Sequence, residues 1–317
     1  MMRRLPRILL ALTLALSAAF AAFWYSRPEE LSFEEHRALV PHAEASRFAE
    51  VGGVRVHYQE RGSGPALVLI HGNNSWLYTW KDVVDALPEE FRVVALDLKG
   101  FGFTAKPAGG DYGNEAQAAL VVGLMDELGI TRAVLVGSSL GGGVALAAAI
   151  DYPERVAGLV LVGSAAFTDP RGASLAPSYV NWPYLGAALA ALALTSDRLV
   201  RDGLAESFYD QTKVTDERVA AYYLPLTTRA GQRGALEVRR QRDMSRVERL
   251  LGRVRQPALL VWGAEDRVIP LEDGRRLQAG LADARLVVFD ACGHLPQEEM
   301  PERFAREVIN FAAGLKD

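Results

Sequence analysis

The stretch that decides the fold runs from residue 133 to residue 143 and reads Ala-Val-Leu-Val-Gly-Ser-Ser-Leu-Gly-Gly-Gly. It begins with an apolar run that is typical of a buried strand, and the alanine-rich residues 142–150 that follow are typical of a helix. Between them, Gly137, Ser139 and Gly141 match the pattern G-x-S-x-G, which describes a sharp strand-to-helix turn with a serine at its apex. The stretch therefore predicts that Ser139 is a nucleophile.

The composition of the whole chain narrows the class of protein. The chain has 317 residues, of which 50% are hydrophobic and 23% charged, enough for one large α/β domain with an insertion or for two smaller domains. The formal net charge is −4, so the chain lacks the excess of basic residues that is typical of nucleic-acid-binding proteins, and we expect no nucleic-acid partner. Cys292 is the only cysteine and the five histidines show no close metal-ligand spacing. We therefore expect no disulfide, no metal and no other cofactor.

The N-terminus has a composition of its own. Three arginines precede an uncharged stretch, residues 8–26, that ends in three consecutive aromatic residues. This order is typical of a membrane anchor or of a signal peptide, for which Ala19-Phe20-Ala21 offers a cleavage site. Because the aromatic residues follow that site, we favour a retained anchor. We expect residues 1–26 to hold the catalytic domain outside the cytoplasm at a membrane, or to be cleaved from a secreted or periplasmic protein.

Beyond a polar spacer at residues 27–46, strand-like and helix-like runs alternate. A hairpin at residues 48–60 is followed by strand-like runs at 66–70, 93–96, 133–136, 157–162, 258–262 and 286–289, and by helix-like runs at 115–128, 142–150, 273–281 and 301–313. Buried strands that alternate with helices predict a mostly parallel, doubly wound sheet over residues 47–317. The interval from about 168 to 255 has no comparable strand, and we expect a helical lid there.

A serine hydroxyl needs a base to remove its proton, and the base needs an acid to orient it. The expected chain order is serine, acid, histidine, and His294 is the only histidine downstream of Ser139. Asp266, at the exit of the strand-like run 258–262, is the preferred acid. Asp169 stays open as the alternative.

An oxyanion that develops on the substrate needs two hydrogen-bond donors. We expect them to be the backbone N–H of Leu140 and that of Asn73, in the loop that begins with His71 and Gly72. His71 is interpreted as a support for that loop. Three further residues are expected to contact the substrate: Asn74, Trp76 and Trp182.

From about residue 48 to residue 314 these motifs together resemble the α/β-hydrolase fold family, in its serine-nucleophile branch. The resemblance implies a mostly parallel, eight-stranded sheet flanked by helices, with a helical lid insertion. It also implies a catalytic triad of Ser139, His294 and Asp266. The segment Asp97-Leu98-Lys99-Gly100-Phe101-Gly102 resembles one common in the family and is interpreted as structural. Haloalkane dehalogenases and epoxide hydrolases of this fold use an aspartate nucleophile, so a serine at this turn argues against both.

The main functional interpretation is a serine hydrolase of the carboxylesterase or lipase kind. It would cleave an apolar ester or related acyl compound through an acyl-enzyme. In this interpretation His294 deprotonates Ser139, then protonates the leaving group, then activates water. One alternative is a carbon–carbon bond hydrolase of dienone-type substrates, which shares the fold and triad. Another is a non-catalytic binding protein on the same scaffold.

Overall fold

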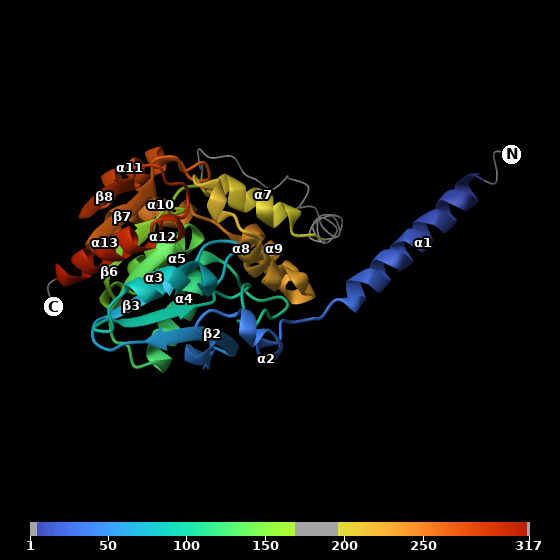
Figure 1. Cartoon of the computed structure of the whole chain (residues 1–317), viewed down its shortest axis with the longest axis horizontal. Helices are drawn as coiled ribbons and strands as arrows, with labels where there is room; N and C mark the ends of the chain where they lie inside the picture. The colour runs from blue at the N-terminus through green and yellow to red at the C-terminus, as the bar shows by residue number, and fades with distance from the viewer. Residues whose placement is uncertain (1–4, 169–195, 316–317) are drawn as a thin grey trace.

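The computed structural model describes residues 5–168 and 196–315, and its centre is an eight-stranded sheet with helices on both faces (Figure 1). The strands are β1 (Ser46–Val51), β2 (Val54–Arg61), β3 (Ala66–Ile70), β4 (Arg92–Leu96), β5 (Ala133–Ser138), β6 (Val156–Val162), β7 (Ala258–Gly263) and β8 (Ala284–Phe289). Their spatial order is β1-β2-β4-β3-β5-β6-β7-β8. The pairs β1–β2 and β2–β4 are antiparallel and the remaining pairs are parallel. The predicted eight-stranded, mostly parallel α/β-hydrolase fold is confirmed.

Helices connect and cover these strands. The α-helices are α1 (Leu5–Ser26), α2 (Phe33–His36), α3 (Lys81–Ala86), α4 (Asn114–Glu127), α5 (Leu140–Asp151), α7 (Arg198–Ser207), α8 (Asp216–Tyr223), α9 (Arg229–Gln241), α10 (Ser245–Leu250), α11 (Leu271–Gly280), α12 (Pro296–Glu299) and α13 (Pro301–Ala313). Short 3₁₀ turns are η1 (Arg37–Leu39), η2 (Ala43–Ala45), η3 (Leu77–Trp80), η4 (Pro153–Arg155), η6 (Gln211–Lys213), η7 (Leu224–Thr227) and η8 (Leu251–Arg253).

The alternation of side chains along each strand divides the core into two layers. On β3, Val68 and Ile70 join the layer that contains α4 and α5, whereas Leu67 and Leu69 join the layer that contains α3 and α13. Successive side chains of a strand point to opposite faces, so a strand covered on both sides must be apolar throughout. This is why β3 appears in the sequence as a continuous apolar run.

The segment that follows α1 is fastened to the lid region. Backbone N–H groups of Arg229 and Ala230, at the start of α9, donate to the carbonyl oxygens of Pro28 and Glu29 at 3.0 and 2.8 Å. The Glu29 carboxylate also pairs with Arg229 at 3.1 Å and with Arg233 at 2.9 Å. Free N–H groups at a helix N-terminus favour such acceptors. The connection between α1 and the body is therefore fixed at α9, while α1 itself extends away from the sheet (Figure 1).

The prediction of a membrane anchor is contradicted. Residues 5–26 do form one helix, α1, but none of the helices in the described part of the chain is both long and apolar enough to cross a bilayer. The predicted location outside the cytoplasm rested on that anchor and is withdrawn with it.

The predicted lid lies only partly within the described residues. From residue 196 to residue 255 the structure contains helices α7 to α10 and no strand, as expected. Residues 169–195 lie outside the described part. The division into segments 1–26, 27–46 and 47–317 stays a prediction.

Candidate active site

The predicted nucleophile turn stands at the carboxyl end of β5. Ser139 has φ 52° and ψ −115°, a conformation that L-residues adopt only under strain. Its backbone N–H donates to Val162 at the end of β6 at 2.8 Å, and its carbonyl accepts from Ala165 at 3.0 Å. These two bonds hold the strained residue between the ends of neighbouring strands. The partly exposed Ser139 side chain is thereby fixed at the edge of the sheet.

The glycines of the motif are required by close backbone contacts. A Cβ on Gly137 would lie 2.3 Å from the carbonyl oxygen of Gly141. A Cβ on Gly141 would lie 2.1 Å from the carbonyl oxygen of Ile70, at the end of β3. Both distances are far inside van der Waals contact, so only glycine fits. The G-x-S-x-G spacing therefore reflects the packing of α5 against the ends of β3 and β5.

The predicted base and acid form a buried pair. The Nδ1 atom of His294 lies 2.8 Å from Oδ2 of Asp266, and the two residues are 5% and 7% exposed. The other oxygen, Oδ1, accepts from the backbone N–H groups of Val268 and Ile269 at 2.9 and 2.8 Å. An ionised Asp266 thus accepts the Nδ1 proton and leaves Nε2 as the basic nitrogen.

The end of β6 lies next to both the His294–Asp266 pair and the turn at Ser139. Gly163, with φ 47°, follows the Val162 carbonyl that receives the Ser139 N–H. A Cβ on Gly163 would lie 3.0 Å from Nδ1 of His294 and 3.2 Å from Oδ2 of Asp266. Among the described residues, the hydrogen bonds at this site join His294 to Asp266 and do not join it to Ser139.

The loop after β3 lies against the nucleophile. A Cβ on Gly72 would lie 3.2 Å from Cβ of Ser139, so this loop and the nucleophile turn are in direct contact. Asn73 follows in the loop and is exposed, whereas Leu140 is buried at the start of α5. The two residues predicted to supply the oxyanion donors thus each directly follow one of the two residues in contact, and their role stays a prediction.

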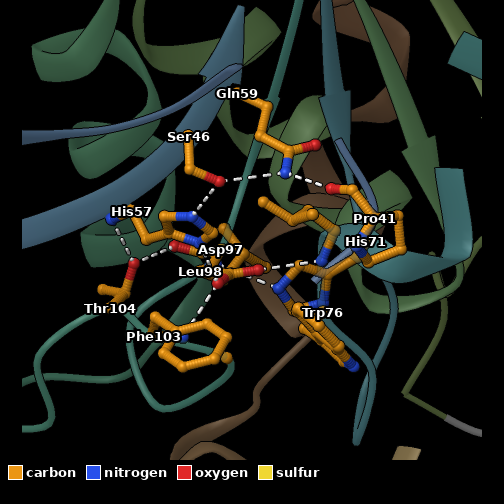
Figure 2. Close-up of polar contacts among 12 residues, drawn as sticks. Pro41, Ser46, His57, Gln59, His71, Trp76, Asp97, Leu98, Phe103 and Thr104 are labelled. Atoms are coloured by element: carbon orange, nitrogen blue, oxygen red, sulfur yellow. Dashed lines mark hydrogen bonds and ion pairs between the residues drawn. The ribbon is translucent and has the colours of Figure 1, made fainter. Parts of the chain in front are cut away.

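Buried polar residues beneath this loop hold it in place (Figure 2). Nδ1 of His71 donates to the carbonyl of Gly72 at 2.7 Å, and Nε2 accepts from Leu98 N–H at 2.9 Å. Asp97 accepts from Leu77 N–H at 2.8 Å, and its Oδ2 lies 2.8 Å from Nδ1 of His57. His71 and Asp97 both occupy the supporting positions expected of them.

The pKa shifts beneath the loop indicate a neutral His71 ring and an ionised Asp97 paired with His57. Burial lowers the pKa of His71, which keeps the ring neutral and lets Nε2 accept a hydrogen bond. Burial, the largest single influence, acts to raise the pKa of Asp97, but the surrounding charged and hydrogen-bonding groups, His57 first among them, together outweigh it, so that this pKa lies below its ordinary value. Asp97 is therefore an ionised acceptor for its neighbours.

The roles predicted for Trp76 and Asn74 in binding substrate stay predictions, and the structure describes the surroundings of both residues. Trp76 is fully buried, and its indole N–H donates to the carbonyl of Ala221 in α8 at 2.9 Å, so it anchors the lid region. Asn74 is exposed, with φ 53°. Trp182 and the alternative acid Asp169 lie outside the described residues.

Sequence reasoning missed a group of buried polar side chains around α12. Gln297, Glu298 and Thr79 are each at most 3% exposed, and they hydrogen-bond to one another. The only signal in the sequence is Pro-Gln-Glu-Glu immediately after His294-Leu295. Polar residues there fit an exposed loop equally well, so the signal is weak.

The fold and the serine turn define an enzyme class, and comparison with known proteins agrees. The chain belongs to the alpha/beta hydrolase fold family, whose model matches residues 65–301. It is a hydrolase of that family.

Three similar proteins give the class more detail. The chain is 33% identical to 2-hydroxy-6-oxo-6-phenylhexa-2,4-dienoate hydrolase of Comamonas testosteroni, covering 81% of this chain and 90% of that protein. Its structure is similar to a meta-cleavage product hydrolase from Pseudomonas fluorescens IP01, with TM-score 0.70, 31% identity and coverage of 84% and 97%. It is also similar to a membrane phospholipase A described as a bacterial virulence factor, with TM-score 0.73, 27% identity and 99% of each chain covered.

These relatives correct the main functional interpretation. The expected ester substrate is contradicted because similar proteins are named as hydrolases of 2-hydroxy-6-oxo-dienoates, of 2-hydroxymuconate semialdehyde and of a meta-cleavage product. The alternative interpretation, a carbon–carbon bond hydrolase, is the better supported one. The physical reason for the error is that both reactions need the same serine, base and oxyanion donors. The motifs identify the attacking group and leave the identity of the departing group open.

Proposed function

We propose that the protein hydrolyses a carbon–carbon bond in a 2-hydroxy-6-oxo-dienoate or a closely related conjugated diketone. The observation that carries the proposal is the 33% identity to a dienoate hydrolase over 81% of the chain. The geometry supports the hydrolytic part of the proposal, because the strained Ser139, the buried His294–Asp266 pair and the loop at Gly72 lie together at the carboxyl-terminal edge of the sheet.

In the proposed reaction Ser139 attacks the keto carbonyl while Nε2 of His294 takes the hydroxyl proton. Asp266, fixed by two backbone N–H groups, orients the ring and stabilises its charged form. The backbone N–H groups of Leu140 and Asn73 stabilise the oxyanion that forms.

Breaking a carbon–carbon bond makes a carbon leaving group, and this sets the substrate class. The electron pair of the broken bond must be delocalised, so the dienoate first tautomerises to its 2-oxo-3-enoate form, in which the 2-hydroxyl proton has moved to C5. When the C5–C6 bond breaks, its electron pair then passes through C4 and C3 to the C2 oxygen and forms a dienolate. The protonated His294 gives its proton to that oxygen, and the fragment leaves as a 2-hydroxydienoate. Water, activated by His294, hydrolyses the acyl-Ser139 intermediate and yields a carboxylic acid.

The test is a substrate panel with a matched nucleophile variant. Purified full-length protein is assayed with 2-hydroxy-6-oxo-dienoates that differ in the group on the keto carbon, and with aryl esters and phospholipids. We expect dienoate turnover at a kcat/KM about 100-fold above that for any ester. Ser139→Ala should lower that turnover by about 10³-fold or more.

Two results would contradict the proposal. If esters are cleaved far faster than every dienoate, the carbon leaving group is wrong. If folded wild-type protein neither turns over a substrate nor reacts with a fluorophosphonate, the scaffold serves binding alone.

A further inference from the structure

A chain of buried hydrogen bonds connects the nucleophile turn with α12 and η3. The amide nitrogen of Gln297 donates to Oγ of Ser138 at 3.3 Å and to Oγ1 of Thr79 at 3.0 Å. Thr79 in turn donates to Oε1 of Glu298 at 2.6 Å. These four side chains are between 0% and 3% exposed. The residue at one end, Ser138, directly precedes Ser139.

The other end of the chain is on lid helix α8. Arg218 and Tyr222 are four residues apart, so they share one face of that helix. The hydroxyl of Tyr222 donates to Oε1 of Glu298, and Nε of Arg218 lies 3.0 Å from Oε2. One buried carboxylate therefore forms an ion pair with Arg218 of α8 and accepts two hydroxyl groups, that of Tyr222 from α8 and that of Thr79 from η3.

The donor directions along this chain are consistent. The Gln297 amide donates to Thr79, and both hydroxyls donate to the carboxylate. Burial raises the pKa of Glu298, while Arg218, Thr79 and Tyr222 act to lower it. A buried charge and its partners are a poor source of stability compared with apolar packing, but they specify one arrangement of the groups that they join.

The catalytic chemistry leaves these groups unused. The bond from His294 goes to Asp266, and the oxyanion donors are backbone groups, so none of the reacting atoms needs Gln297 or Glu298. Yet Gln297 lies in the four-residue helix that begins two residues after His294. It is thus placed to connect the base, the nucleophile turn and the lid.

We propose that Gln297 is a positioning residue. Its hydrogen bond to Ser138 holds the nucleophile turn in place. Because Gln297 is joined to α8 through Thr79 and Glu298, the position of α8 determines where the turn is held. The inference rests on the proposed role of Ser139 as the nucleophile. A displacement of α8 changes the support of the turn through this chain. A misplacement of about 1 Å between reacting groups lowers a rate by about 100-fold. The arrangement makes the reactivity of Ser139 depend on the position of the lid helix.

The experiment measures the reactivity of Ser139 directly. Full-length protein is treated with a fluorophosphonate, whose phosphonyl group bonds to the Ser139 oxygen with loss of fluoride, and the second-order rate of inactivation is recorded. Gln297→Leu keeps the volume and removes the donor. We expect it to lower this rate by about tenfold or more. On a dienoate, kcat should fall while KM stays within about twofold, as for an interaction that serves the transition state alone.

Two further variants separate positioning from folding. Gln278→Leu is the matched control, because Gln278, on α11, donates to the carbonyl oxygen of Ala284 on β8 and takes no part in the hydrogen bonds that join Ser138 to Glu298. It should inactivate at the wild-type rate. Ser138→Ala removes the acceptor and leaves Gln297 bound to Thr79, so it should lower the rate as Gln297→Leu does. If Gln297→Leu fails to fold, the inactivation rate of Ser138→Ala tests the positioning role by itself.

The link to α8 is tested by a double-mutant cycle. Tyr222→Phe should lower the inactivation rate a few-fold in the wild type and by less than twofold in Gln297→Leu, because the connection is already broken. Additive effects would overturn the coupling, and a wild-type rate in Gln297→Leu and Ser138→Ala would overturn the positioning role. If instead Ser139→Ala reacts as fast as wild type, the proposed nucleophile is wrong, and that result is distinct from either of these.

Discussion

The described part of the molecule contains two buried histidine–aspartate pairs with the same contact. In each, Nδ1 of the ring lies 2.8 Å from Oδ2 of the carboxylate: His294 with Asp266, and His57 with Asp97. Nε2 of His57 lies 3.1 Å from Oγ of Ser46, so this second group has the connectivity of a catalytic triad (Figure 2). Distances alone do not tell the two apart.

The surroundings separate the two pairs. The ring of His57 is enclosed by Phe33, Phe48 and Phe103, with ring centres 5.0 to 5.4 Å away, and Ser46 also accepts a bond from Gln59. Asp97 ties down Leu77 and Phe103 besides His57, as a structural junction does. Asp266 and His294 instead stand at the sheet edge where the strained Ser139 turn emerges. What makes a His–Asp pair catalytic is a strained nucleophile and donors beside it.

The largest difference should appear when each histidine receives the same substitution. His294→Leu is expected to lower dienoate turnover by about 10⁴-fold or more, because it removes the base that activates Ser139. The measurement is kcat/KM on the folded variant, with circular dichroism as the control for folding. A loss below about tenfold would remove His294 from the proposed mechanism.

His57→Leu should act on stability. It leaves the Asp97 carboxylate buried without its ring partner, which costs about 3 kcal/mol or more. We expect a lower midpoint in urea unfolding, and kcat within about tenfold of wild type under conditions where the variant is folded. A large loss of kcat with unchanged stability would show that the second pair serves the reaction.

A smaller effect is expected at Gly163, which lies against the catalytic pair. Gly163→Ala places a Cβ 3.0 Å from Nδ1 of His294 and strains a residue with φ 47°. Turnover should fall about tenfold or more because the ring must move. Gly129→Ala is the matched control: Gly129 has φ 64° and open space around it, so only stability should fall, by about 1 kcal/mol. Equal turnover in the two variants would contradict the predicted contact.

The smallest effect concerns Lys106, whose charge lies near the structural pair. Burial lowers the pKa of Lys106 to about 8, although Asp97 acts to raise it. The unfolded chain then binds more protons than the folded protein between about pH 8 and pH 10.5, so stability rises with pH in that window. Compared with Lys106→Met, the wild type should gain about 1 kcal/mol in unfolding free energy from pH 7 to pH 9. Parallel pH profiles for the two proteins would contradict this.

The sequence predicted the fold well because its signals are local. A continuous apolar run such as residues 66–70 can be buried only on both faces of a sheet, and Gly52-Gly53 predicted the turn of the β1–β2 hairpin, in which Val51 pairs with Val54. The predicted base and acid are in contact for a similar reason. In a parallel sheet the strand exits lie at one edge, so His294 after β8 and Asp266 after β7 become neighbours.

Other features depended on contacts between distant residues. The Trp76 indole N–H donates to the carbonyl oxygen of Ala221, 145 residues away, a contact that no local pattern predicts. The connection of Ser138 to Gln297 spans 159 residues and has no periodic pattern that could reveal it. The membrane anchor was predicted from the order of basic, apolar and aromatic residues, but no helix in the described part of the chain is long and apolar enough to cross a membrane.

The sequence by itself determined the sheet and the serine turn, because each depends on local backbone requirements, and it singled out His294 as the proposed base, because there is one histidine downstream of Ser139. Only the tertiary structure distinguished the His–Asp pair at the sheet edge from the one sealed among phenylalanine rings. It alone connected the lid helix to the nucleophile turn. The physical reason is that enclosure and buried hydrogen bonds join residues far apart in the chain, and their geometry exists only once the layers have packed.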